Sequence, residues 1–102
     1  MNGNVSFNIA ELLKTKKFKF SYCRYDYLLC PSIVKVIMWL YEQHNIWVSV
    51  TPYNDEELSQ TLWENKIILI NDEYNDCSDY TFYHSPKEAY EAAIEYVLTK
   101  LI

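Results

Sequence analysis

The densest group of side chains able to bind a metal lies in residues 71–79, which hold four carboxylates and two amides. Such oxygens are the ligands that Ca²⁺ prefers, and an EF-hand loop has glycine at its sixth position and glutamate at its twelfth. Counted from Asn71, these positions are occupied by Asp76 and Phe82. The spacing therefore excludes an EF-hand and indicates a solvated polar turn.

Cysteine and histidine could form a zinc site or a nucleophilic pair, but their spacing favours neither. Zinc sites use closely spaced pairs, whereas Cys23 and Cys30 are seven residues apart and Cys77, His44 and His84 are scattered. The odd number of cysteines indicates free thiols in a reducing compartment. With a single glycine, the chain cannot form a Gly-rich phosphate loop. We assign no catalytic, cofactor-binding or metal-binding residue, and we expect no enzyme and no cofactor.

Basic residues gather near the N-terminus. Residues 1–25 hold five basic side chains and one acid, a net charge of +4, and residues 26–102 carry −9. The candidate basic patch consists of Lys14, Lys16, Lys17, Lys19 and Arg24. It could contact an acidic partner or lie on the acidic body of the chain itself.

Residues 17–22 alternate basic or polar with aromatic side chains, which predicts a strand with an aromatic face. Aromatic rings among lysines are also typical of single-strand nucleic-acid binding. Because the two faces point in opposite directions, we favour an edge strand whose lysines discourage aggregation.

Capping residues and the spacing of apolar side chains predict the helices and strands that position these residues. Ser6 predicts a short helix to about Lys16, and a second helix spans residues 31–44 and stops at Asn45. Alternation predicts a strand from Ile46 that ends at Pro52. Further strands are expected within residues 62–70 and 80–83, and residues 54–60 are a loop or a short helix.

The last eighteen residues predict a helix that covers a sheet. Ser85 and Glu88 have the spacing of a capping box in which Glu88 reaches the Ser85 amide, and Pro86 suits the first helical position. Apolar side chains then recur every three or four residues. The stripe expected to meet the sheet is Tyr90, Ile94, Val97 and Leu101.

Trp39 is a candidate partner anchor. On the predicted helix of residues 31–44 it lies on the polar side with Lys35 and Glu42, and interface centres are enriched in large aromatic side chains. The alternative is that Trp39 packs against the aromatic face of residues 18–22.

Together these elements predict one α+β domain over residues 1–102. A three- to four-stranded antiparallel sheet carries two main helices on one face in an α-β-β-β-α core, with a short N-terminal helix and strand added. No stretch approaches about 18 unbroken apolar residues, and no secretory signal pattern is visible. We therefore expect a cytoplasmic protein.

Three patches resemble a numerous family of small uncharacterised proteins from gut bacteria and their phages. They are Ile9 to Cys23, Cys30 to Trp47, and the Ser-Pro-Lys-Glu-Ala-Tyr-Glu-Ala-Ala-Ile-Glu helix at residues 85–95. The resemblance implies a phage or mobile-element context and carries over no activity. The element order also resembles the double-stranded RNA-binding fold, which presents lysines at the start of its last helix. Here that turn has only Lys87, followed by Glu88, Glu91 and Glu95.

The function expected from these observations is a small protein-interaction module that binds a second copy or a host protein. The alternative is a nucleic-acid-associated protein that uses the basic patch. Salt dependence would distinguish the two, because phosphate contacts weaken steeply with salt.

Overall fold

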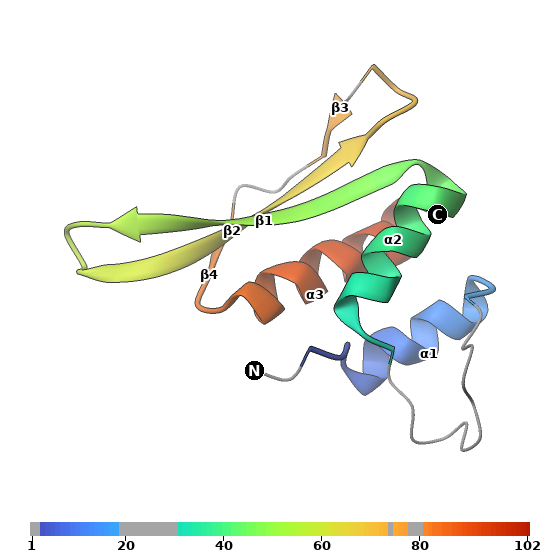
Figure 1. Ribbon diagram of the computed structural model, residues 1–102, viewed down its shortest axis with the longest axis horizontal. Helices are drawn as coiled ribbons and strands as arrows, with labels where there is room; N and C mark the ends of the chain where they lie inside the picture. The colour runs from blue at the N-terminus through green and yellow to red at the C-terminus, as the bar shows by residue number, and fades with distance from the viewer. Residues whose placement is uncertain (1–2, 19–30, 74, 78–80) are drawn as a thin grey trace.

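The computed structural model describes residues 3–18, 31–73, 75–77 and 81–102 and has an α+β fold (Figure 1). Three helices pack beside an antiparallel sheet. In chain order the elements are α1 (Phe7–Thr15), α2 (Ile33–His44), β1 (Ile46–Asp55), β2 (Gln60–Leu69), β3 (Asn75–Asp76), β4 (Phe82–Tyr83), α3 (Pro86–Tyr96) and the π-helical turn η1 (Val97–Leu101).

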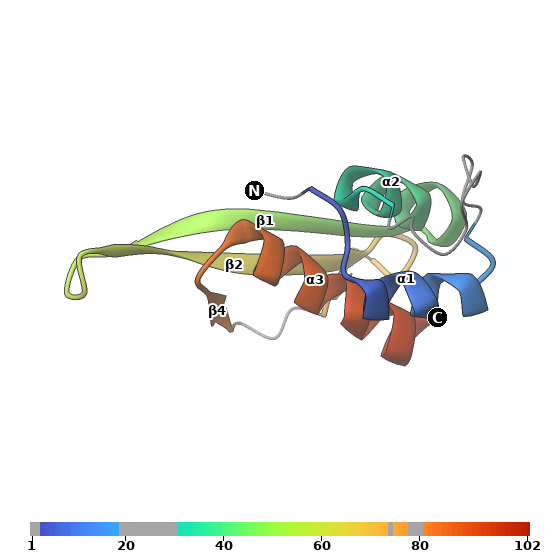
Figure 2. The same ribbon diagram turned by 90° about the horizontal axis from the view of Figure 1, so that it is seen from below.

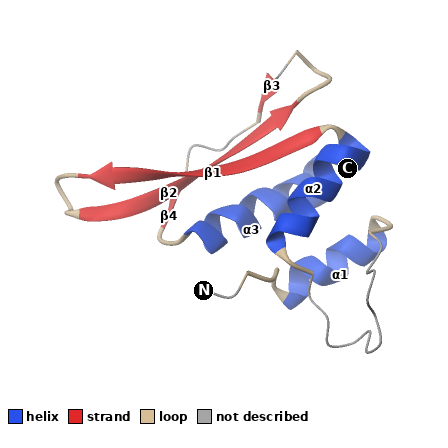
Figure 3. Ribbon diagram, in the orientation of Figure 1, coloured by secondary structure: helices blue, strands red, loops and turns tan. Residues whose placement is uncertain are grey.

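The sheet is built on a long hairpin of β1 and β2, which pair antiparallel over ten residues each. β3 and β4 both pair with the other edge of β2, β3 at Ile68 and Leu69 and β4 at Trp63 and Glu64. The sheet is thus three strands wide, and its third strand is in two short pieces. Figure 3 shows the turn end of the hairpin extending beyond the helices.

Both main helices cover the same face of the sheet, as predicted. Along β1, Ile46 and Val48 are buried while Trp47 between them is 40% exposed, so one face is covered and the other is open. α2 contacts β1, and α3 contacts both β1 and β2. Figures 1 and 2 show the two helices on one side of the strands. The core lies in this interface, where period-two strand residues meet the apolar stripes of the helices.

α1 extends the core on the far side of α3. It buries Ile9, Ala10 and Leu13 and contacts α3 and η1. Before α1, a single bridge joins Asn4 and Ser32, with main-chain bonds from Val5 to Pro31 and from Ile33 to Gly3. This bridge was not predicted, because it pairs isolated residues rather than periodic runs.

Each of the three predicted helix starts is capped by a serine. The hydroxyls of Ser6, Ser32 and Ser85 accept from the main-chain N–H three residues later, at 3.4, 3.2 and 3.1 Å. Asn45 ends α2 in the left-handed conformation (φ 56°), also as predicted. Such caps are local, since each satisfies a free N–H or carbonyl of its own helix end.

One detail of the last cap was wrong. Glu88 does not reach the Ser85 amide; its carboxylate accepts from the main-chain N–H of His84 at 3.3 Å. The extended backbone of Ser85 (φ −144°, ψ 155°) sets the direction in which the chain enters α3. In this direction the Glu88 carboxylate lies next to the N–H of His84 and not that of Ser85.

The prediction that Pro52 ends its strand was also wrong. β1 continues to Asp55 and β2 begins at Gln60. Of residues 54–60, which were predicted as a loop or a short helix, only residues 56–59 form the hairpin turn. Proline is tolerated because β1 is at the sheet edge. The Asp55 carboxylate accepts from the N–H groups of Glu57 and Leu58, and Ser59 adopts a left-handed φ of 52°.

Three other predicted segments differ in type or extent from the structure. The expected polar turn of residues 71–79 contains β3, and the expected strand of residues 80–83 contributes only β4 among the described residues. The predicted strand of residues 17–22 begins instead with a turn, since Lys17 has a φ of 66°; residues 19–22 lie outside the described ranges.

The C-terminal helix changes type at Val97. Its last turn is π-helical, with the Ile102 N–H donating to the Val97 oxygen at 3.0 Å. The Thr99 hydroxyl donates to the Glu95 oxygen at 2.8 Å and so competes with the main chain for that acceptor. The buried residues are Ala89, Ala93, Ile94, Val97 and Leu98, so the stripe is rotated from the predicted one, and Tyr90 and Leu101 lie at its margin.

Candidate functional site

Trp39, the predicted partner anchor, is half-buried in a small aromatic cluster. Its ring meets the ring of Phe18 edge-on at 5.2 Å and that of His44 at 4.8 Å between centroids. Lys35 and Glu42, predicted beside it, are both exposed. The structure therefore places much of the Trp39 ring in intramolecular packing and leaves the two charges at the surface. Phe20 and Tyr22 lie outside the described residues.

An exposed apolar stripe lies on α2 next to these charges. The core uses Ile33, Val36, Ile37 and Leu40. Val34, Met38 and Tyr41 remain 69%, 40% and 44% exposed. The helix is apolar over a wider arc than one contact with the sheet can cover.

Trp47 continues this stripe onto the open face of the sheet. Its ring meets that of Tyr41 at 5.7 Å in an edge-on arrangement. We call Val34, Met38, Tyr41 and Trp47 the outer patch. The sequence analysis did not identify Val34, Met38 and Tyr41 as exposed, because the rotation of α2 on the sheet depends on tertiary packing.

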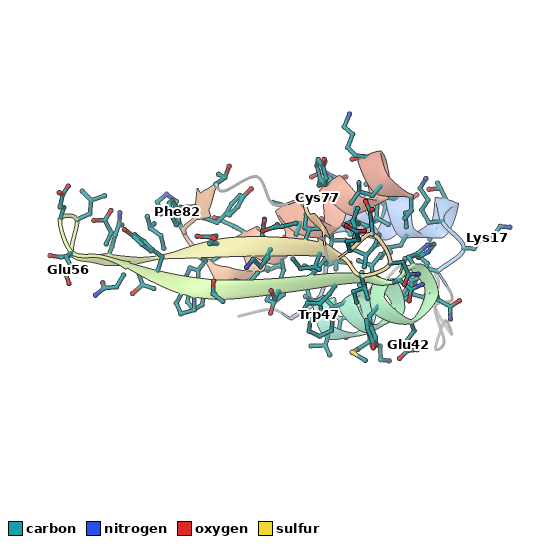
Figure 4. All side chains as sticks on the ribbon, turned by 90° about the horizontal axis from the view of Figure 1, so that it is seen from above. Lys17, Glu42, Trp47, Glu56, Cys77 and Phe82 are labelled. Carbon is teal, nitrogen blue, oxygen red and sulfur yellow. The ribbon has the colours of Figure 1, made fainter. Side chains whose placement is uncertain are left out.

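Charged side chains flank the outer patch on one side. At 3.6 residues per turn, Lys35 and Glu42 lie about 20° apart around α2, next to Met38 and away from Tyr41. Figure 4 shows Glu42 and Trp47 on the α2 side of the molecule. An apolar centre with a polar rim is the usual arrangement of a protein-binding surface.

A second aromatic pair lies at the other end of the open sheet face. Tyr53 of β1 and Phe82 of β4 have ring centroids 4.8 Å apart and are 48% and 43% exposed. The cross-strand pair of Ser49 and Lys66 separates them from Trp47. The open face of the sheet is therefore not one continuous apolar surface.

The basic patch is partly engaged within the protein. Lys14 lies 3.4 Å from Glu11, and the Lys16 ammonium donates to the main-chain oxygen of Ile102 at 3.0 Å. Lys17 is exposed, and Lys19 and Arg24 lie outside the described residues. Of the three described lysines of the basic patch, two thus contact the protein itself.

A groove of about 410 Å³ runs between α1 and α3 and is lined by Glu88, Glu91 and Glu95. Two of these carboxylates have structural roles: Glu91 accepts from the main-chain N–H of Ser6 and Glu88 from that of His84. The sequence did not predict this groove, because it arises where two helices distant in the chain meet.

Metal-binding residues do not converge in the described part of the chain. No group of three or more His, Cys, Asp or Glu side chains there could hold a metal ion. Cys77 is half-buried and forms no disulfide with a described residue, and Cys23 and Cys30 lie outside the described ranges. None of the described helices has the length and apolar character needed to span a membrane.

Comparison with known proteins gave no match: no family model, no curated protein and no solved structure is significantly similar to this chain.

Proposed function

We propose that this protein is a small protein-interaction module that binds its partner through the outer patch. The observation that carries the proposal is the exposure of Val34, Met38 and Tyr41 on one side of α2, joined to Trp47 by a ring contact. Removing such side chains from water is favourable by roughly 25 cal/mol per Å² of apolar surface. Contiguous exposed apolar surface with a polar rim is typical of interaction sites.

Strand addition at the outer edge of β1 is less favourable than contact with the patch. The Cys77 N–H donates to the Ile67 oxygen, so the main-chain groups of Ile67 point toward β3. Val48 of β1 is paired with Ile67, so the main-chain N–H and C=O groups of Val48 point away from β2. Every second residue of β1 has the same orientation. Pro52 occupies one of these outward positions and has no N–H to donate, which protects the edge from pairing.

The cellular context proposed for this interaction comes from the sequence resemblance. The resemblance to small proteins from gut bacteria and their phages supports a partner inside a bacterial cell. The engagement of Lys14 and Lys16 within the protein reduces the positive surface available to a nucleic acid, which supports a protein partner over the nucleic-acid alternative.

The proposal is tested by affinity capture from bacterial lysate, with and without nuclease treatment, using three baits. These are the wild-type chain, Met38→Glu, and Leu58→Ser as a matched control at the exposed hairpin turn. We expect wild type and Leu58→Ser to retain the same protein, a second copy included, and Met38→Glu to retain at least tenfold less. Equal recovery by all three baits would refute the proposal. Recovery that disappears with nuclease would favour the nucleic-acid alternative.

A further inference from the structure

We infer that the partner is a second copy of this chain, bound by antiparallel packing of α2 against α2 about a two-fold axis near Met38. The inference rests on the proposed function of the outer patch. Its evidence is the order of side chains along α2 and the sign of the two charges beside them.

The apolar residues of α2 are arranged symmetrically about Met38. Val34 and Tyr41 are seven residues apart, and Met38 lies close to their midpoint. A two-fold axis perpendicular to the helix reverses the residue order, so it places Val34 of one copy against Tyr41 of the other. Met38 then meets its own equivalent on the axis. Each side chain of the stripe has an apolar neighbour in this arrangement, as an isologous interface requires.

The charges follow the same symmetry. Lys35 and Glu42 are also seven residues apart, with their midpoint beside Met38, and both lie on one flank of the stripe. An axis lying in the interface and crossing the helix keeps each flank on its own side. Lys35 of each copy therefore faces Glu42 of the other, which forms two equivalent ion pairs. In parallel packing the two-fold axis runs along the helices and moves each flank to the opposite side, so neither ion pair forms. The charges therefore favour the antiparallel arrangement.

The position of α2 allows a second copy to approach. Figure 2 shows α2 along one border of the molecule, where the described elements that it contacts are β1 and α3. The twelve residues of α2 span about 18 Å, and Trp47 widens the contact toward the sheet. A surface this short is at the low end of specific interfaces, which bury about 800 Å² per partner, so we expect a weak, reversible dimer.

Sedimentation equilibrium across a wide concentration range tests the dimer, and the decisive variants exchange the charges. Lys35→Glu and Glu42→Lys should each raise the dimer dissociation constant several-fold, because each creates two like-charge contacts. The double variant Lys35→Glu/Glu42→Lys should restore the wild-type constant within about twofold. Inside one helix the two residues are about 10 Å apart along the axis, so restoration would have to occur between copies.

Apolar variants provide the second arm. Met38→Glu should raise the dissociation constant at least tenfold, and Leu58→Ser should leave it unchanged. Thermal melting monitored by circular dichroism checks that each variant is folded.

A wild-type chain that stays monomeric at every concentration would overturn the dimer, as would a dimer that none of the α2 variants weakens. If the monomeric chain still captures a different protein in a Met38-dependent manner, the proposed function stands with another partner. If both assays are negative, both proposals fail.

Discussion

The side-chain amide of Asn65 donates a hydrogen bond to the main-chain oxygen of Ala89, 3.1 Å away, across the interface between β2 and α3. Both residues are essentially inaccessible to solvent, and Asn65 is the buried polar residue of the described core. Its Oδ1 atom accepts no hydrogen bond from the described residues. A single polar link inside an apolar interface specifies how α3 is placed along β2, because moving the helix would leave both groups unsatisfied.

Replacing Asn65 with aspartate should destabilise the fold in a pH-dependent way. The substitution is nearly isosteric, but it places a buried carboxylate against the Ala89 oxygen, so the folded-state pKa of the new carboxyl is raised above its unfolded value of about 3.9. Below about pH 3 the carboxyl is protonated in both states and the penalty is small. As the pH rises toward the folded-state pKa, the penalty grows to roughly 2–5 kcal/mol.

Urea unfolding of wild type and Asn65→Asp at several pH values measures this difference. Subtracting the wild-type free energy at each pH removes the contribution of the native carboxylates. A difference that stays constant from pH 3 to pH 7 would contradict the burial of Asn65.

The cap at Ser85 should contribute about 1 kcal/mol to the free energy of unfolding. Ser85→Ala removes the acceptor for the Glu88 N–H and leaves that donor with water alone. Lys87→Ala is the control, since it shortens a side chain in the same turn and keeps the cap. A melting temperature that falls equally in both variants would mean that the hydroxyl has no specific role.

Glu91 should attach the start of α1 to α3. Its carboxylate accepts from the Ser6 N–H at the positive end of the α1 dipole, so Glu91→Ala should cost about 1–2 kcal/mol. Glu95→Ala, one turn further along the exposed side of α3, should cost less than about 0.5 kcal/mol. Amide hydrogen exchange gives a local readout: the α1 amides should exchange faster in Glu91→Ala and at the wild-type rate in Glu95→Ala.

Ser59→Gly should stabilise the hairpin. Ser59 has a φ of 52°, a left-handed conformation that costs a residue with a Cβ atom about 1 kcal/mol and glycine almost nothing. The larger entropy of the unfolded glycine chain offsets part of this gain, so the expected increase is about 0.5 kcal/mol. Glu57→Gly, in the same turn without a positive φ, should destabilise instead. Opposite signs in chemical denaturation would establish the turn conformation.

The hairpin shows why some elements escaped prediction. Four described residues have a positive φ, namely Lys17, Asn45, Ser59 and Glu73, and none is glycine. Glycine is the strongest sequence signal for such positions, and its absence hid the turn between β1 and β2. At Asn45 the residue type itself favours the left-handed conformation, and there the helix stop was predicted correctly.

Short-range order was determined by the sequence itself. The serine caps, the Asn45 stop and the alternation of Ile46, Trp47 and Val48 depend on neighbours within one or two turns or within one strand, so residue type and spacing suffice to predict them. The α+β class follows as well, because two amphipathic helices and consecutive strands have few ways to cover one sheet.

Only the tertiary structure decided which apolar side chains stay outside. The apolar arc of α2 is wide enough to meet the sheet at several rotations, and the sequence singled out Trp39 as the residue left over. In the fold, Phe18 and His44 pack on Trp39, while Val34, Met38 and Tyr41 face away from the core. The rotation of α2 is set by close packing of the whole core, which involves residues far apart in the chain. A local sequence pattern therefore cannot predict it.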